Sequence, residues 1–221
     1  FLQWKTGHGI VERYGSQQMP LQGRGFGRLD VRVYPLDPMD RSYWPFPLTA
    51  VSTNEQKAPP APGEEPAKFT EPGQHIAPEQ LALQLRRLGS PPVSTIVKLP
   101  LAENGAAANF GLDLQSYFAT LSGKTQPGTY LVGIRKLDES TLRSWVRVQV
   151  TDLSLSTIEE EGAVKFAVNS LSSGAPVSAA NITIEGSRNN TWLTVMQGTT
   201  GADGTFHWQP SGNARDGVSL R

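Results

Sequence analysis

The 221-residue sequence contains no cysteine, which excludes disulfides, thiolate nucleophiles and cysteine-ligated metals. It has no excess of either charge, because 20 basic and 20 acidic residues balance to a formal net charge of zero. Without a net field to attract a polyanion, a nucleic-acid partner is not expected. No apolar run approaches the roughly 20 residues that a membrane-spanning helix needs.

Histidine is also scarce. His8, His75 and His207 lie in a glycine-rich arm, a proline-rich stretch and a predicted strand, and no two have the spacing of paired metal ligands. No serine lies in a Gly-x-Ser-x-Gly motif, and the glycines of 23–27 precede a strand pattern instead of a phosphate-binding helix. The sequence therefore predicts no catalytic residue, no metal site, no cofactor and no enzymatic activity.

Two groups of acidic residues each allow more than one interpretation. Asp30, Asp37 and Asp40 could offer oxygens to calcium, but the simpler reading is turn capping and pairing with Arg32 or Arg41. Residues 159–161 are three consecutive glutamates. They indicate a solvated hinge or loop, or a surface that faces a basic patch on a neighbouring domain.

The strongest structural pattern lies in 127–151. Tyr130, Val132 and Ile134 alternate with other residues, and the valines of 146–150 do the same after a polar link. Period-two patterning predicts a β-hairpin with one buried face. Thr151, Asp152 and Leu153 then interrupt the pattern, so we expect them to form a hinge between two domains, 1–151 and 152–221.

The remaining patterns are also those of short strands. The 22 glycines and 17 prolines punctuate them as turns. Outside the hairpin, strands are predicted at 29–33, 93–99, 110–117, 163–169, 177–185, 191–197 and 205–208. This spacing is typical of tandem antiparallel β-sandwiches of immunoglobulin or fibronectin-III type, an all-β fold class.

One helix is predicted, within an insertion at about 51–90 of the first domain. Residues 51–77 include a polyproline-like run with little to bury. Pro78 then suits a first helical turn, leucines follow at helical spacing, and Gly89 suits the end. The first residue is Phe and the last four read as a strand. We therefore expect a piece of a longer protein whose second sandwich continues past the end, with any signal peptide or lipid anchor elsewhere.

Tyr43, Trp44 and Phe46 form an aromatic cluster in a proline-punctuated loop. If exposed, this cluster would be an interface; if covered, it would hold the loop in place. A third reading, glycan binding, would use Trp44, Trp145 or Trp208 on one exposed face.

Eight segments share a pattern with one known family. They are Tyr130–Val132, Trp145, Val148–Leu155, Val168–Val177, Asn181–Ile184, Thr199–Phe206, Glu12–Gly15 and Asp37–Pro47. These segments resemble the bacterial α2-macroglobulin family. The resemblance covers most of 127–209, and 1–50 to a lesser extent.

This resemblance implies a large periplasmic protein, often a lipoprotein anchored at the inner membrane, built from consecutive macroglobulin sandwiches. Such proteins trap proteases after cleavage of a bait segment, and many carry a Cys-Gly-Glu-Gln thioester. This sequence has no cysteine, so the thioester lies elsewhere in the parent or the parent lacks one. No functional residue of the family transfers to this chain.

The first functional hypothesis is thus a scaffold fragment of a broad-spectrum protease inhibitor, whose partners are proteases and neighbouring macroglobulin domains. The alternative is an adhesin-like module that docks other envelope proteins through sheet edges or the aromatic loop.

Overall fold

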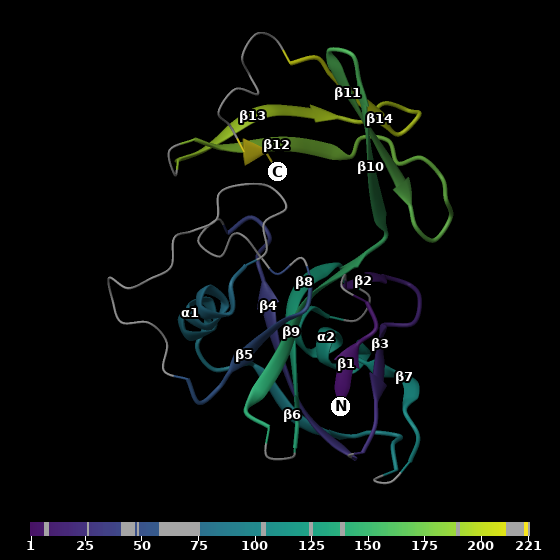
Figure 1. Cartoon of the computed structure of the whole chain (residues 1–221). Helices are drawn as coiled ribbons and strands as arrows, with labels where there is room; N and C mark the ends of the chain where they lie inside the picture. Colours follow the sequence, from purple (N-terminus) through teal and green to yellow (C-terminus); the bar gives the residue numbers. More distant parts are fainter. Residues whose placement is uncertain are drawn as a thin grey trace. The chain divides into compact units, whose positions relative to one another are not determined.

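The computed structural model describes residues 1–6, 9–25, 27–40, 47, 49–57, 76–102, 105–123, 126–137, 140–188, 191–210 and 219–220 (Figure 1). The described residues form two compact units, an N-terminal unit that ends at Val150 and a C-terminal unit that begins at Thr151. Both consist of antiparallel sheets, which confirms the predicted all-β class. That each unit folds independently stays a prediction.

The N-terminal unit contains two sheets. The smaller has the strand order β1-β3-β7, and the larger has the order β2-β9-β8-β4-β6, with β5 added beside β9. The bounds are β1 (Leu2–Trp4), β2 (Gly9–Glu12), β3 (Gln18–Gly23), β4 (Arg28–Leu36), β5 (Val51–Asn54), β6 (Val93–Lys98), β7 (Ala108–Asp113), β8 (Gly128–Lys136) and β9 (Leu142–Thr151).

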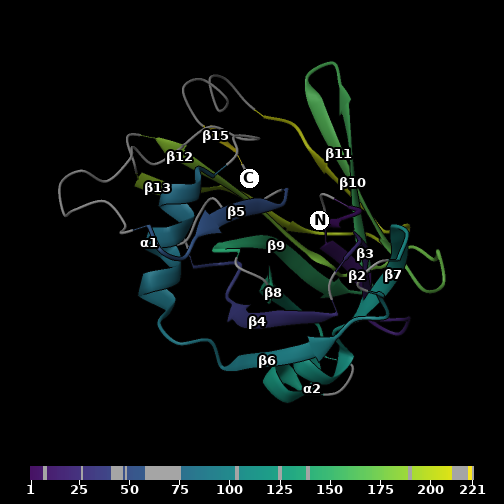
Figure 2. The same cartoon turned by 60° about the horizontal axis from the view of Figure 1, so that its bottom comes forward.

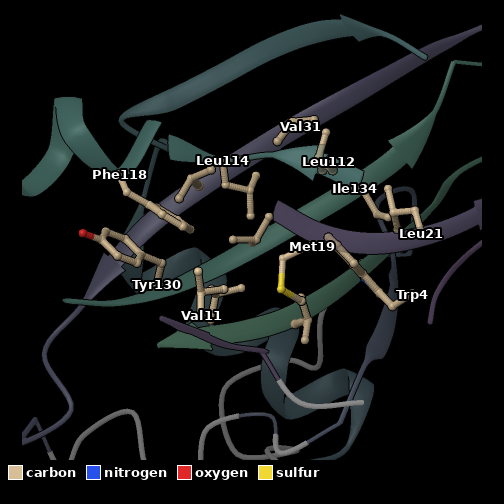
Figure 3. Packing of buried hydrophobic residues seen from close by; sticks show 14 of the residues in the cluster. Trp4, Val11, Met19, Leu21, Val31, Leu112, Leu114, Phe118, Tyr130 and Ile134 are labelled. Atoms are coloured by element: carbon tan, nitrogen blue, oxygen red, sulfur yellow. The ribbon is translucent and has the colours of Figure 1, made fainter. Parts of the chain in front are cut away.

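The main core of this unit lies between the two sheets. Strand β8 contributes Tyr130, Val132 and Ile134, and β9 contributes Val146, Val148 and Val150, all at most 3% exposed. Figure 3 shows Tyr130 beside Phe118 of α2 (Gln115–Ser122). Their rings stack with centroids 4.2 Å apart. The face predicted to be buried is therefore confirmed.

The expectation that only one face of the hairpin is buried was wrong. Its other face carries Leu131 and Trp145, both 2% exposed, which pack in a second apolar cluster with Leu81 of α1 (Pro78–Leu88). The two helices lie on opposite faces of the larger sheet (Figure 2). A strand covered on both sides loses the simple alternation, because its second face also becomes apolar.

The helix α1 has the bounds that the sequence predicted, and the extent of the insertion at about 51–90 stays a prediction. Residues 51–54 form β5, which pairs with β9, and Ile76 is only 2% exposed within the second cluster. Both ends of the 51–77 segment are therefore part of the folded unit. Residues 58–75, with the polyproline-like run, lie outside the described residues.

The helix α2 was missed, because 110–117 was predicted as a strand. Strand β7 ends at Asp113, whose Oδ1 accepts a hydrogen bond from the Gln115 amide at 2.9 Å. Leu114 and Phe118 then share one helical face, and both are buried. Their i, i+4 spacing was a signal for a helix, but the preceding Phe110, Leu112, Leu114 alternation obscured it.

The C-terminal unit has two sheets of three strands, ordered β10-β11-β14 and β13-β12-β15. Their inner faces enclose a small core of Val164, Val168, Ile182, Ile184 and Trp208. The bounds are β10 (Leu153–Glu160), β11 (Ala163–Ser170), β12 (Asn181–Arg188), β13 (Thr191–Thr199), β14 (Thr205–Trp208) and β15 (Ser219–Leu220).

Two segments of this unit differ from the expected ones. Residues 153–160 form β10, so Glu159 and Glu160 lie in a strand and not in a loop, and Glu161 lies in the turn that follows. No residue of β10 is buried, so no buried apolar face marks this strand in the sequence. Strand β12 begins at Asn181 instead of 177. The Thr200 hydroxyl donates to the Val177 carbonyl and accepts from the Ala180 amide, which holds the intervening residues as a turn.

Candidate functional site

The most concentrated polar feature is a group of five charged residues on the larger sheet of the N-terminal unit. We call it the arginine cluster: Asp30, Arg32, Glu55, Arg135 and Arg143. Strands β4, β8 and β9 present these side chains on the face opposite the main core, and Glu55 follows β5 directly. Its members come from segments far apart in the sequence.

Arg143 is the centre of the cluster, and its side chain is 0% exposed. Its Nη2 donates to Asp30 Oδ2 at 2.6 Å, and its Nε donates to Glu55 Oε1 at 2.7 Å. Its Nη1 donates to the Asp30 carbonyl at 3.0 Å. A buried guanidinium is stable only with such complete pairing, because desolvation of an unpaired charge is costly.

Arg32 and Arg135 complete the cluster at its partly exposed edge. Arg32 lies 2.9 Å from Glu55, and Arg135 lies 3.1 Å from Asp30 and 3.0 Å from Glu55. Three guanidinium groups thus neutralise two carboxylates. Because each carboxylate is held by arginines, neither is available as a general base, and the arrangement serves to join β4, β5, β8 and β9.

Trp145 lies next to the cluster and explains a glycine in the neighbouring strand. Its Nε1 donates to the Thr53 hydroxyl at 2.9 Å, and the Arg143 guanidinium lies 5.8 Å from its ring centroid. Gly133 pairs with Trp145 across the ladder. A Cβ at Gly133 would collide with the indole, so only glycine leaves room for this ring.

Burial acts to raise the pKa of Asp30, but the hydrogen bond and positive charge of Arg143, with Arg135 and Arg32, outweigh it and hold the pKa below the ordinary value of an aspartate. A carboxyl with a lowered folded-state pKa stabilises the fold above its unfolded pKa, and this stabilisation is lost as the pH falls through the folded pKa. We therefore expect the free energy of unfolding to decrease below about pH 4.

This acid dependence should be weaker in Asp30→Asn, measured by urea denaturation at pH 7, 4 and 3. The matched control is Asp37→Asn. Asp37 is exposed and only caps a turn by accepting the Met39 amide, so its variant should keep the wild-type dependence. If the free energy of unfolding decreased equally with falling pH in Asp30→Asn and in the wild type, Asp30 would not be the source of the acid dependence.

The expected hinge residues make hydrogen bonds within the C-terminal unit. Thr151 ends β9, and its hydroxyl accepts the Leu153 amide at 2.9 Å where β10 begins. The Asp152 carboxylate accepts hydrogen bonds from the Ser170 hydroxyl at 2.9 Å and the Ser172 amide at 3.0 Å. That these three residues act as a hinge stays a proposal.

Asp152→Ala should lower the free energy of unfolding by about 1–2 kcal/mol, because it removes two hydrogen bonds to a carboxylate. Glu161→Ala is the control, since Glu161 is exposed. Thermal unfolding monitored by circular dichroism would measure both. If Asp152→Ala lowered the melting temperature no more than the control does, the hydrogen bonds of this carboxylate to residues 170 and 172 would not stabilise the unit.

Of the other residues considered as candidate site residues, some are described by the structure and some are not. His207 is exposed. No cluster of metal-ligating side chains occurs in the described residues. Trp145 and Trp208 are buried, at 2% and 5% exposure, which removes them as a glycan-binding surface. Outside the described residues lie Tyr43, Trp44, Phe46, Arg41, His8 and His75.

The sequence analysis missed the arginine cluster as a unit. It paired Asp30 with Arg32, which lies 3.7 Å away, but not with Arg135 or Arg143. The available signal was the presence of arginines within the 127–151 hairpin, at positions between its apolar residues. Among the described residues, no helix is long and apolar enough to cross a bilayer.

No family model and no curated protein matches the sequence. The structure is similar to native Escherichia coli α2-macroglobulin spanning domains NIE-MG1, at 14% identity and a TM-score of 0.62, covering 100% of this chain and 95% of that one. An E. coli structure spanning MG0-NIE-MG1 gives 13% identity and a TM-score of 0.57, with 62% of that chain covered.

A Salmonella α2-macroglobulin mutant is also similar, at 11% identity and a TM-score of 0.50; this chain spans 11% of its length. At such identities the likeness concerns the fold. It agrees with the segments by which the sequence resembles this family, in both units of the chain. The chain therefore has the fold of the N-terminal domains of the bacterial α2-macroglobulins.

Proposed function

We propose that the chain is a non-enzymatic scaffold segment of a bacterial α2-macroglobulin-like protease inhibitor. The observation that carries this proposal is the end-to-end correspondence with the E. coli NIE-MG1 structure, which covers 100% of this chain. The arginine cluster also supports a structural role for this unit. Both of its carboxylates are paired with arginines, so neither is free to react with a substrate.

The partners of the parent protein would then be proteases and neighbouring macroglobulin domains. We place the parent in the periplasm, with a lipid anchor at the inner membrane as a further proposal. Serial β-units joined by short connections would form a frame that holds a captured protease while contributing no reactive group. A signal from bait cleavage would need such a frame to rearrange.

The experiment uses the full-length parent protein incubated with a protease of broad specificity. A physically trapped protease should keep its activity on a small chromogenic peptide and lose most of its activity on a large protein substrate. Parent protein unfolded by heat beforehand is the control. Equal loss of both activities would indicate active-site blockage instead of trapping, and no loss of either would refute the proposal.

A further inference from the structure

Strand β10 exposes apolar side chains at the edge of a sheet. Leu153, Leu155 and Ile158 are 51%, 59% and 49% exposed. One edge of β10 pairs with β11, and no other strand of the described residues pairs with it. An edge strand with open backbone groups and apolar side chains is a template for the addition of another strand.

The register shows which backbone groups of β10 are free. The Leu171 amide donates to the Asp152 carbonyl at 2.7 Å, which makes residues 152 and 171 a hydrogen-bonded pair of the antiparallel ladder. Such pairs recur at every second residue, so 154, 156, 158 and 160 bond to β11. The N–H and C=O groups of Leu155 and Thr157 therefore point away from β11, toward the free edge. The Leu153 amide is already bonded to the Thr151 hydroxyl.

The side chains along this edge divide into an apolar and an acidic half. Leu155 is opposite Val168 in the register, and opposed residues share a face. It therefore points to the core side of the sheet and is still 59% exposed. At the other end, Glu159 and Glu160 of β10 and Glu161 after it are all exposed. A strand added here would meet leucines at one end and carboxylates at the other.

We infer that the free edge of β10 binds an extended segment of a partner polypeptide that runs antiparallel to it. Lysine or arginine at the start of this segment lies opposite Glu159 and Glu160, and β-branched apolar residues lie opposite Ile158, Leu155 and Leu153. Backbone hydrogen bonds provide affinity, and the charge pattern sets direction and register. The inference rests on β10 alone and is independent of protease inhibition.

The test measures binding of two fluorescent peptides to the whole chain by anisotropy. The first is Lys-Lys-Val-Thr-Thr-Val-Thr-Val, and the second has glutamate in place of both lysines. The lysine peptide should bind about tenfold more tightly at low salt, and the difference should shrink at high salt because exposed charges are screened. Equal affinities at low salt, or no binding of the lysine peptide, would overturn the inference.

Variants at Thr157 test the backbone component. Thr157→Pro removes an N–H that faces the free edge and leaves the bonds to β11 in place, so the lysine peptide should bind about tenfold more weakly. Thr157→Val keeps the N–H and is the matched control, with affinity close to that of the wild type. Circular dichroism verifies folding, and wild-type affinity in a folded Thr157→Pro would refute strand addition.

A charge-reversal variant decides the question if Thr157→Pro does not fold. Glu159→Lys combined with Glu160→Lys alters exposed side chains only, so folding should be retained. This double variant should prefer the glutamate peptide over the lysine peptide. An unchanged preference would show that the peptides bind elsewhere on the chain.

Discussion

Arg143→Met should lower the free energy of unfolding by about 3–5 kcal/mol, the range for removing one partner of a buried ion pair. The Arg143 side chain is 0% exposed and bonds to both carboxylates of the arginine cluster. Its removal leaves Asp30 and Glu55 close together with only the partly exposed Arg32 and Arg135. Urea denaturation would measure the loss, and hydrogen exchange of the β8 and β9 amides would locate it.

Two further variants make this prediction specific. Arg28→Met removes an exposed arginine of β4 and should change stability by less than about 0.5 kcal/mol. Adding Asp30→Asn to Arg143→Met should recover part of the loss, because the more buried of the two carboxylates is then uncharged, while Glu55 keeps its ion pairs with Arg32 and Arg135. If Arg143→Met lowered the free energy of unfolding by less than about 1 kcal/mol, Arg143 would contribute no more to stability than an exposed ion pair does, and the prediction would be wrong.

Val148→Asp should cost several kcal/mol and unfold the N-terminal unit at room temperature, because a carboxylate without a partner would be placed in an apolar core. Val148 is 0% exposed and lies in the main cluster between the two sheets. Its backbone and side chain also lie against Gly9 of β2, so the site has no room for water to solvate a charge.

The neighbouring residue provides the control. Gln149 is exposed on the opposite face of β9, so Gln149→Asp should leave the unit folded. Both variants can be compared by circular dichroism and thermal unfolding. A Val148→Asp protein with the wild-type melting temperature would show that β9 does not direct this residue into the core.

Local sequence patterns predicted correctly those elements in which all the local signals favour the same secondary structure. The helix α1 was predicted with its observed bounds, because Pro78 and Gly89 mark its ends and leucines occupy its buried face. Strand β14 was likewise predicted over its observed range. In these segments, propensity, turn chemistry and burial all favour the same structure.

The elements that were missed depend on tertiary structure. Strand β10 has no buried residue, so its stability comes from pairing with β11, which no local pattern reveals. The arginine cluster joins Asp30 to Arg143, which are 113 residues apart. A single sequence shows such residues only as isolated charges. Their meeting is decided by strand order, which periodicity does not specify.

The strand order of the larger sheet has a consequence for chain cleavage. Strand β4 precedes residues 58–75 in the sequence, yet it pairs along its length with β8 on one side and with β6 on the other, both of which follow them. Strand β5 is likewise paired with β9. A single peptide bond cut anywhere in 58–75 would leave two fragments that are still interleaved in one sheet. This unit would thus tolerate a proteolytic nick without coming apart.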